Sequence, residues 1–248
     1  MDVSLVIPCY DEARRLDAGA LRAARLEGAR LELVLVDDGS RDGTRALLES
    51  IARDRPDTRV VALERNVGKA EAVRRGVLDA LSRRPGAVGY WDADLSTPLS
   101  ELAAFVQVLE QRPEVDLVYG SRVKLMGRRI DRLMTRHYLG RIFATAASMA
   151  LALPVYDTQC GAKLFRATPL VARVFEEPMR ARWVFDVEIV ARYMALDPRG
   201  PAAIDVALFE LPLIRWRHVP GSKVGPLDFA RAALDLARIR AAYRPSRS

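Results

Sequence analysis

The sequence predicts an α/β fold in which helices cover both faces of a mostly parallel sheet. The first observation is a set of apolar runs of strand length, rich in β-branched residues, that end at Ile7, Val36, Leu63, Tyr90 and Tyr119. The second is that helical patterns fill the gaps between these runs, roughly over residues 16–28, 44–53, 68–82 and 99–110. Strands that alternate with helices in this way predict right-handed crossovers and parallel pairing.

The second half of the chain is less regular, but we find no linker or repeat in it and expect one domain over residues 1–248. Its parts are a first half (1–120), a second half (121–225) and a C-terminal helix with a tail (226–248). After residue 120 we expect helices over about 131–151, 185–196 and 226–243, and strands over about 163–165, 204–208 and 213–217. The last helix is amphipathic, and its expected apolar side comprises Leu227, Ala230, Leu234, Ala237 and Ile239.

The composition excludes several classes of protein. Hydrophobic residues make up 50% and charged residues 29%, which excludes wholesale disorder. Two cysteines are too few for a disulfide framework. The longest apolar run, residues 142–155, is too short to span a bilayer, and the N-terminus lacks the basic segment of a signal peptide. We therefore expect a cytoplasmic protein.

The charge is +7, from 39 basic and 32 acidic residues. A basic chain can bind nucleic acid, an anionic membrane or a phosphorylated small molecule, and arginine favours bidentate recognition of phosphate. Basic residues concentrate between positions 122 and 141. Arginines also lie beside the apolar side of the last helix, so that helix either contacts an anionic membrane or packs on the domain. They are Arg231, Arg238, Arg240 and Arg244.

Acidic residues follow three of the predicted strands at the point where each strand ends. They lie at positions 11–12 after the first strand, at 37–38 after the second, and at 92 and 94 after the fourth. In open α/β sheets the ligand lies beyond the carboxyl ends of the strands. Acids gathered at one edge repel one another unless a cation or hydrogen-bond donors occupy the site. The alternative for residues 37–44 is a helix N-cap.

The Asp92-Ala93-Asp94 string is the sharpest of these patterns. Two carboxylates two residues apart at a strand end can share one hard divalent ion, Mg²⁺ or Mn²⁺, that bridges phosphate oxygens. Lys69 opens the third helix, where it either helps to hold phosphate or is simply solvated. The chain has neither a P-loop nor a dinucleotide-binding fingerprint, and its two histidines and two cysteines match no zinc spacing.

Together these motifs resemble family 2 glycosyltransferases of the GT-A fold, and among them the polyprenyl-phosphate sugar synthases of the dolichyl-phosphate mannose and glucose types. The matching strings run from residue 4 to about 224 and are SLVIPCYDE, LVLVDDGSRDGT, NVGKAEAVRRG, WDADLSTP, VYGSR, DTQCGAKLF, WVFDVEI and PGSKV. DTQCG-KLF followed by W-FDVEI points to the glucose type. The chain departs from the pattern at Ala70, where a second glycine is usual, and at Ala162, where an aromatic residue is usual.

The resemblance implies that the first half binds a nucleotide sugar and the second half an acceptor. It implies that Asp92 and Asp94 hold Mg²⁺ or Mn²⁺ with the diphosphate and ribose, and that Ser96 lies near the ion. The candidate substrate-binding residues are Pro8, Tyr10, Glu12, Asp37, Asp38, Lys69, Asp92, Ala93 and, in the late Gly-Ser-Lys motif, Lys223.

On the acceptor side, Arg122 and Arg136 match the arginines that bind the acceptor phosphate, and Asp157 matches the acid of the acceptor loop. With Asp94 these three are the candidate catalytic residues. The alternative for Arg122 is a simple ion pair with an acid at the sheet edge. Glu188 is either a solvated helix position or a site residue.

The expected activity is an inverting, metal-dependent transfer of a hexose from a nucleotide sugar, of the UDP-glucose or GDP-mannose type, to a polyprenyl phosphate or another phosphate-bearing acceptor. A phosphate with a second pKa of ~6 is already mostly a dianion at pH 7, so it needs arginines to position it more than it needs a base. A hydroxyl acceptor would need a general base, for which Asp157 is the candidate. A lipid-borne acceptor implies peripheral contact with the inner face of the cell membrane.

Three other interpretations are open. A sugar-1-phosphate nucleotidylyltransferase should have a Gly-rich, basic loop after the first strand, where Pro-Cys-Tyr-Asp-Glu stands here. A nucleic-acid-binding protein fits the charge, but no basic stripe with interleaved aromatic residues is visible, so we expect no nucleic-acid partner. A non-catalytic relative is disfavoured by the intact pair of Asp92 and Asp94.

Overall fold

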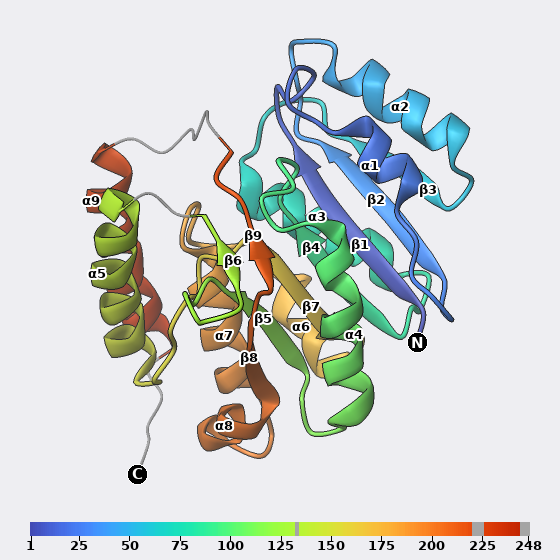
Figure 1. Ribbon diagram of the computed structural model, residues 1–248. Coiled ribbons are helices and arrows are strands. Elements are labelled where there is room, and N and C mark those ends of the chain that lie inside the picture. Colours follow the sequence, from blue (N-terminus) through green and yellow to red (C-terminus); the bar gives the residue numbers. More distant parts are fainter. Residues whose placement is uncertain (132–133, 220–225, 244–248) are drawn as a thin grey trace.

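The centre of the protein is a seven-stranded sheet with the strand order β3-β2-β1-β4-β7-β5-β8 (Figure 1). The computed structural model describes residues 1–131, 134–219 and 226–243, without the side chains of 134–142 and 226–230. The strands are β1 (Val3–Cys9), β2 (Leu31–Asp37), β3 (Thr58–Ala62), β4 (Ala87–Trp91), β5 (Leu117–Ser121), β7 (Ala162–Arg166) and β8 (Leu208–Pro212). Strand β7 runs antiparallel to β4 and β5, whereas the other neighbours in the sheet are parallel. The predicted mostly parallel sheet is confirmed.

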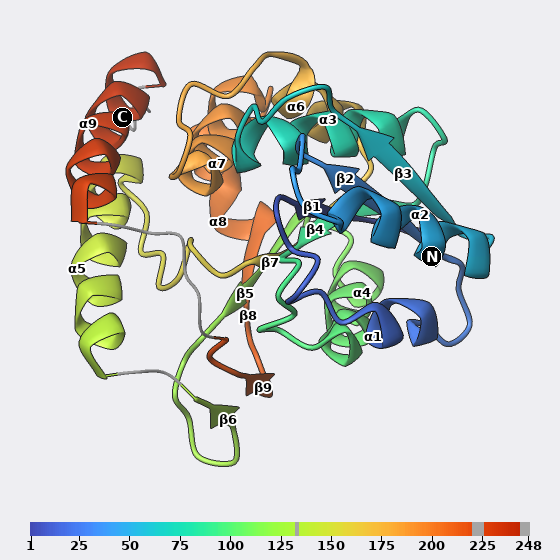
Figure 2. The ribbon, with the colours of Figure 1, turned by 90° about the horizontal axis from the view of Figure 1, so that it is seen from above.

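Helices cover both faces of this sheet because successive strand residues point to opposite sides. In β1, Leu5 and Ile7 belong to one buried cluster and Val6 to the other. The first cluster includes residues from α1 (Ala18–Ala23), α2 (Thr44–Asp54) and α4 (Leu102–Gln111), and the second includes residues from α3 (Lys69–Leu81), α6 (Pro169–Glu176) and α7 (Phe185–Leu196). Figure 2 shows α3, α6 and α7 on the side of the sheet opposite α4 and α1.

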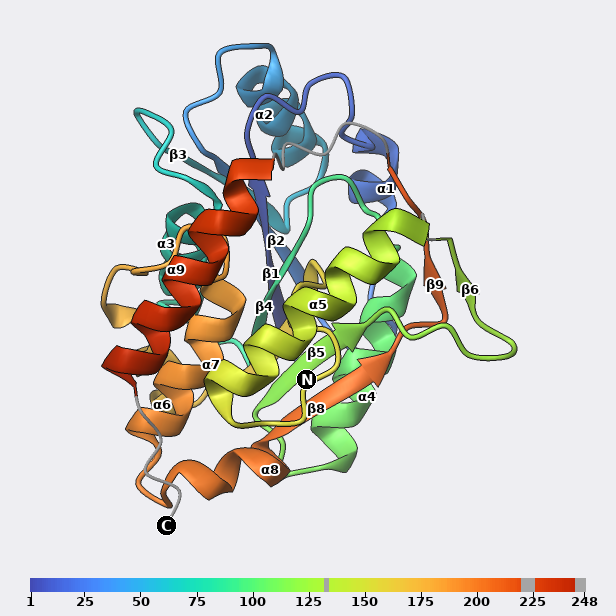
Figure 3. The same ribbon diagram turned by 90° about the vertical axis from the view of Figure 1, so that its left-hand side faces the viewer.

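Two long helices, α5 (Met134–Leu151) and α9 (Pro226–Ala242), lie side by side beyond α7 (Figures 1 and 3). The inward side of α9 is formed by Ala232, Leu236 and Ile239, which are buried and spaced at helical intervals. The predicted apolar side is therefore wrong at Leu234, which is 60% exposed, and at Ala237, which is also exposed. Each lies about half a turn from a buried neighbour, so tertiary packing selected a different side of the helix.

The predicted strand over residues 204–208 is also wrong in its first part. Gly200 has a φ of 93° and Pro201 follows it, so the chain starts a 3-10 turn (η2, Pro201–Ala203) that continues as α8 (Ile204–Ala207). Ile204 and Ala207 are both buried, at a spacing that fits a helical turn as well as a strand end. The strand itself begins only at Leu208.

Three smaller differences separate the predicted helices and strands from those in the structure. The expected strand over 213–217 is reduced to β9 (Arg215–Trp216), which pairs in parallel with an unforeseen β6 (Arg129–Ile130). The first helix is shorter than predicted and begins after the cap Asp17. The unpredicted helix α6 has clear start signals, because Thr168 caps Val171 N (3.2 Å) and Pro169 stands at its first turn.

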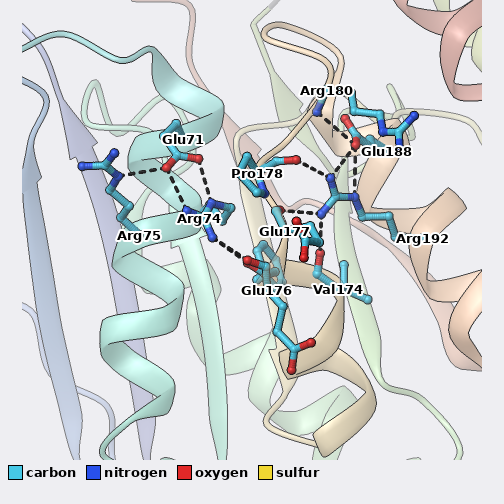
Figure 4. A network of polar contacts seen from close by, with 11 residues as sticks. Glu71, Arg74, Arg75, Val174, Glu176, Glu177, Pro178, Arg180, Glu188 and Arg192 are labelled. Carbon is cyan, nitrogen blue, oxygen red and sulfur yellow. Dashed lines mark hydrogen bonds and ion pairs between the residues drawn. The ribbon is translucent and has the colours of Figure 1, made fainter.

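Glu188 lies in a buried polar network on α7 (Figure 4), so neither expectation for it holds. Its carboxylate accepts hydrogen bonds from Arg192 Nε (3.0 Å) and Nη2 (2.7 Å) and from the backbone of Arg180 (3.1 Å) and Ala181 (2.7 Å). Arg192 in turn donates to the carbonyls of Val174, Glu177 and Pro178. Glu188 therefore fixes α7 to the turn after α6, and its role is structural.

Within the described residues, no helix has both the length and the apolar content needed to cross a membrane.

Candidate active site

The acids predicted from the strand ends are brought together, because β2, β1 and β4 are neighbours and run in parallel. Their carboxyl ends therefore meet at one edge of the sheet. The backbone there adopts unusual conformations: Asp11 after β1 has a φ of 49° and Leu95 after β4 a φ of 48°. Neither is glycine, and strain of this kind collects at functional sites.

Asp37 and Asp38, at the end of β2, are buried and accept hydrogen bonds from loops. Asp38 accepts from Asn66 Nδ2 (3.0 Å) and from the backbone of Val67 (2.8 Å) and Gly68 (3.0 Å), and Asp37 accepts from Ser40 N (3.1 Å). Burial raises the pKa of the Asp38 carboxyl, although the N–H donors of Val67 and Gly68 oppose that shift. Asp38 therefore holds the loop that precedes Lys69.

Lys69 reaches back across the edge to Asp92 and forms an ion pair with its carboxylate. Burial works against the charge on Lys69, but the neighbouring acids, Asp92 first and then Asp186 and Asp94, raise its pKa. Lys69 thus pairs with the acid at the end of β4, although 43% of its side chain stays exposed. Asp92 is also crowded from behind, because a Cβ at Gly161 would lie 1.9 Å from its Oδ2. Only glycine permits this close approach.

Asp94 lies beside Asp92, with its Oδ1 accepting from Ser96 N (2.9 Å) and its Oδ2 3.7 Å from Arg15. Arg15 also pairs with Glu12 (3.3 Å), so it joins the acids that follow β1 and β4. Among the described residues, no group of three or more His, Cys, Asp or Glu side chains could hold an ion alone. Two carboxylates fit Mg²⁺ or Mn²⁺, which take oxygen ligands and complete their coordination with water and substrate phosphates.

Beneath this edge lies a buried ion pair that the sequence reasoning missed. Lys163 on β7 is fully buried, and its Nζ lies 2.8 Å from Asp186 Oδ1 and donates to the carbonyl of Cys160. The ammonium also lies 4.8 Å from the centre of the Tyr119 ring and 5.1 Å from that of Tyr90. Burial lowers the pKa of Lys163 and raises that of Asp186. A lysine followed by two apolar residues within a predicted strand was the available signal.

On the acceptor side of the predicted site, Arg122 and Asp157 form a bidentate pair. Arg122 Nε and Nη2 each lie 2.7 Å from a different Asp157 oxygen, and the backbone N–H of Arg122 donates to the same carboxylate (3.0 Å). Although burial works against its charge, Asp157 raises the pKa of Arg122. Glu210 on β8 orients this pair, because its carboxylate accepts from the backbone of Tyr156 (2.8 Å) and Asp157 (2.7 Å).

The segment 157–161 joins the two sides of the site. Asp157 at its start holds Arg122, while Gly161 at its end accepts a hydrogen bond from Asp92 N (2.8 Å) through its carbonyl. A chain extends by at most about 3.6 Å per residue, so these two ends lie within roughly 14 Å of each other. The structure therefore places the Arg122–Asp157 pair close to the acids at the end of β4.

Not every candidate residue can be placed. Pro8 lies within β1, Tyr10 follows it, and both are half-buried, whereas Ala93 is buried between the two acids. Arg136 lies on α5, but its side chain is outside what the structure describes, and Lys223 falls outside the described residues altogether.

An α/β sheet with acids at the ends of β1, β2 and β4 is consistent with the GT-A fold, and solved structures of glycosyltransferases confirm this fold. Glucosyl-3-phosphoglycerate synthase from Mycobacterium tuberculosis, crystallised with Mn²⁺, UDP and glucosyl-3-phosphoglycerate, has a TM-score of 0.64 over 99% of this chain and 81% of its own, at 20% identity. A mannosyltransferase from Pyrobaculum calidifontis, crystallised with GDP-Man and Mn²⁺, also has a TM-score of 0.64, over 97% of this chain and 63% of its own, at 22% identity.

The family model for glycosyl transferase family 2 matches residues 4–172. The chain is 32% identical to the dolichyl-phosphate β-glucosyltransferase of Mus musculus, over 97% of this chain and 75% of that protein. It is 30% identical to the enzyme of the same description in Dictyostelium discoideum, over 97% and 74%. The chain belongs to glycosyl transferase family 2, it is a glycosyltransferase, and it is of the dolichyl-phosphate glucose synthase type.

Proposed function

We propose that the protein transfers glucose from UDP-glucose to a polyprenyl phosphate, with inversion at the anomeric carbon and with Mg²⁺ or Mn²⁺. The observation that carries the proposal is the short segment 157–161, which joins an arginine suited to phosphate, held by Asp157, to the backbone of Asp92 at the end of β4. The named activity of the relatives supports the sugar and the acceptor. The UDP and Mn²⁺ complex of a structural neighbour supports the donor and the ion.

On the donor side, Asp92 and Asp94 would hold the ion. When bound, that ion neutralises charge on the leaving nucleoside diphosphate. Lys69 lies against Asp92 and carries a positive charge that can bind the same diphosphate. Asp38 holds the loop before Lys69, and Pro8, Tyr10, Glu12 and Asp37 belong to the proposed nucleoside side of the site.

On the acceptor side, Arg122 would bind the phosphate of the acceptor. A guanidinium offers five donors in a fixed fork, so it can keep a carboxylate partner and bind a phosphate oxygen as well. Asp157 is engaged by three N–H groups of Arg122, which suits a positioning residue better than a general base. This contact favours a phosphate acceptor over a hydroxyl acceptor, and Arg136 and Lys223 are proposed as further phosphate ligands.

The test is glucose transfer from UDP-glucose to a polyprenyl phosphate, with Mn²⁺ or with EDTA. Asp94→Asn should lose several kcal/mol of transition-state stabilisation, on the order of 10²–10³-fold in rate, and should bind UDP equally with and without metal by calorimetry. Asp54→Asn, which changes an exposed acid of α2, is the matched control and should behave as the unmodified protein does. Metal-independent UDP binding by the unmodified protein would contradict the metal site.

The same assay separates the two classes of acceptor. With a phosphate acceptor, Arg122→Lys should slow transfer strongly while UDP binding stays intact, because lysine cannot offer the bidentate fork. Asp157→Asn should then cost less than the ~10²–10⁴-fold typical of a lost general base. If Asp157→Asn proves crippling and Arg122→Lys mild, the acceptor is a hydroxyl.

A further inference from the structure

The β5–β6 loop (residues 122–128) projects from the body of the protein, as Figures 2 and 3 show. Its tip carries two large apolar side chains: Met126 is fully exposed and Leu125 is 47% exposed. The chain reverses at Gly127, whose φ of 78° favours glycine. Ile214, also 47% exposed, lies at the base of this loop, because its carbonyl accepts a hydrogen bond from Arg129 N (2.8 Å). Three large apolar side chains therefore reach solvent in one projecting region.

Positive charge surrounds these apolar side chains. A pocket of about 520 Å³ lies beside the loop, and its charged and aromatic lining residues are Arg128, Arg129, Asp131, Arg215, Trp216 and Arg217. Lys124 on the loop adds a fifth cation. Among the residues that the structure describes, no acid forms an ion pair with any of these five cationic side chains. The region is thus an apolar tip with an excess of positive charge at its rim, where Asp131 is the acid among the lining residues of the pocket.

The region is fixed to the active site. The buried carboxylate of Glu101 accepts hydrogen bonds from the backbone of Ile214 (2.9 Å) and Arg215 (3.1 Å). The N–H of Arg217 donates to the carbonyl of Ser96 (2.9 Å), two residues after Asp94. Strands β5 and β8 are parallel, so β6 and β9, which follow them, lie beyond the same sheet edge as the acids. Whatever binds this region therefore lies next to the site.

We propose that the β5–β6 loop and the β6–β9 strand pair dock the protein on an anionic membrane surface, a role that goes beyond the proposed reaction. Leu125, Met126 and Ile214 would enter the interface between head groups and acyl chains, and the arginines of the pocket would bind lipid phosphates. The cationic side chains favour an anionic surface, and the exposed apolar tip favours a partner with an apolar interior, as a bilayer has. Docking in this way turns the active-site edge toward the bilayer.

Two alternatives are less well supported: another docking surface, and another partner for this surface. The last helix, α9, uses its apolar side for packing against α5 and α7, so that side is not available to lipid. Single-stranded RNA would be attracted by the same arginines, but it also needs aromatic side chains for base stacking, and the pocket offers only Trp216 among its lining residues.

The test is vesicle flotation of the full chain, with vesicles that contain no polyprenyl phosphate, so the result does not depend on the proposed reaction. We expect binding to phosphatidylglycerol-rich vesicles, weakened by salt, and little binding to phosphatidylcholine alone. The double variant Leu125→Ser, Met126→Ser should bind about tenfold more weakly, because it loses apolar burial. Arg129→Gln and Arg215→Gln should each weaken binding about fivefold. Met149→Ser changes an equally apolar, exposed side chain on α5 and should bind as the unmodified protein does.

Several results would overturn the proposal: no flotation of the unmodified protein, equal flotation of the double variant, or an equal loss in the Met149→Ser control. Tighter binding to single-stranded RNA than to anionic vesicles, lost in Arg129→Gln, would assign the surface to nucleic acid instead. Unchanged thermal unfolding of each variant shows that the fold is intact.

Discussion

The two halves of the molecule use several of their acids differently. In the first half, Asp37, Asp38 and Asp94 accept hydrogen bonds from backbone N–H groups of loops; Asp37 and Asp38 are buried, whereas the Asp94 side chain is 22% exposed. In the second half, Asp157 and Glu188 are each paired with an arginine that is itself largely buried. Asp94 thus keeps exposed carboxylate surface that a ligand can reach, whereas Asp38, Asp157 and Glu188 use their oxygens to fix loops and helices. The first half thus supplies the acids that we propose bind the ion, and the second supplies much of the framework around them.

Glu188→Ala should give the largest loss of stability. Removing one partner of a buried ion pair leaves an uncompensated charge on Arg192, and we expect the free energy of unfolding to fall by about 3–5 kcal/mol in urea denaturation. The matched control is Glu49→Ala, which removes an exposed pair with Arg45 and should cost only about 0.3–0.5 kcal/mol. Equal losses in the two variants would show that burial does not distinguish these pairs.

Gly161→Ala is a change in the second half that should displace the Asp92 side chain in the first half. The new methyl group would collide with the Asp92 carboxylate, so we expect a loss of about 1–3 kcal/mol in stability and a clear weakening of Mn²⁺-dependent UDP binding. Gly43→Ala is the control, because its Cβ would meet its nearest neighbour, the Cβ of Ala13, at an ordinary 3.8 Å. Thermal unfolding and calorimetry measure both effects. Normal metal-dependent binding by Gly161→Ala would mean that Asp92 does not need its present position.

Lys163→Met should change how stability depends on pH. The Lys163–Asp186 pair carries one proton in total in both the folded and the unfolded chain near neutrality, so it adds no pH dependence. In the unmodified protein burial already raises the pKa of Asp186 from 3.8 to about 8, and removing the neighbouring Lys163 cation does not lower it. The folded variant then binds more protons than the unfolded one between these values, so its stability should fall as pH rises, by up to about 1.4 kcal/mol per pH unit.

The measurement for this prediction is the difference in unfolding free energy between variant and unmodified protein from pH 5 to pH 8, an interval of about three units within the window of the shifted carboxyl. The control is the double variant Lys163→Met, Asp186→Asn, which has no titrating group at these two positions. Its difference in unfolding free energy from the unmodified protein should not change with pH. A flat difference in the single variant as well would mean that Asp186 titrates normally without its partner.

The parts of the site that the sequence predicted are those on regular elements. An apolar run followed by an acid marks a strand end, and parallel strands end at one edge, so the gathering of positions 11–12, 37–38, 92 and 94 followed from the pattern alone. The pairing of Arg122 with Asp157 did not follow from it, because it joins two loops far apart in sequence. The sequence offered an ion pair with an acid at the sheet edge as the alternative role of Arg122, without identifying that acid.

What the sequence determined by itself was the α/β class, most of the elements and the family, because periodicity and short motifs are local properties. Only the tertiary structure decided which side of α9 is buried, that Glu188 is structural, and that Lys163 and Asp186 neutralise each other beneath the site. Each of these depends on which surface another segment covers. Burial sets the free energy of a charge or an apolar side chain, and burial is a property of packing between segments rather than of any one of them.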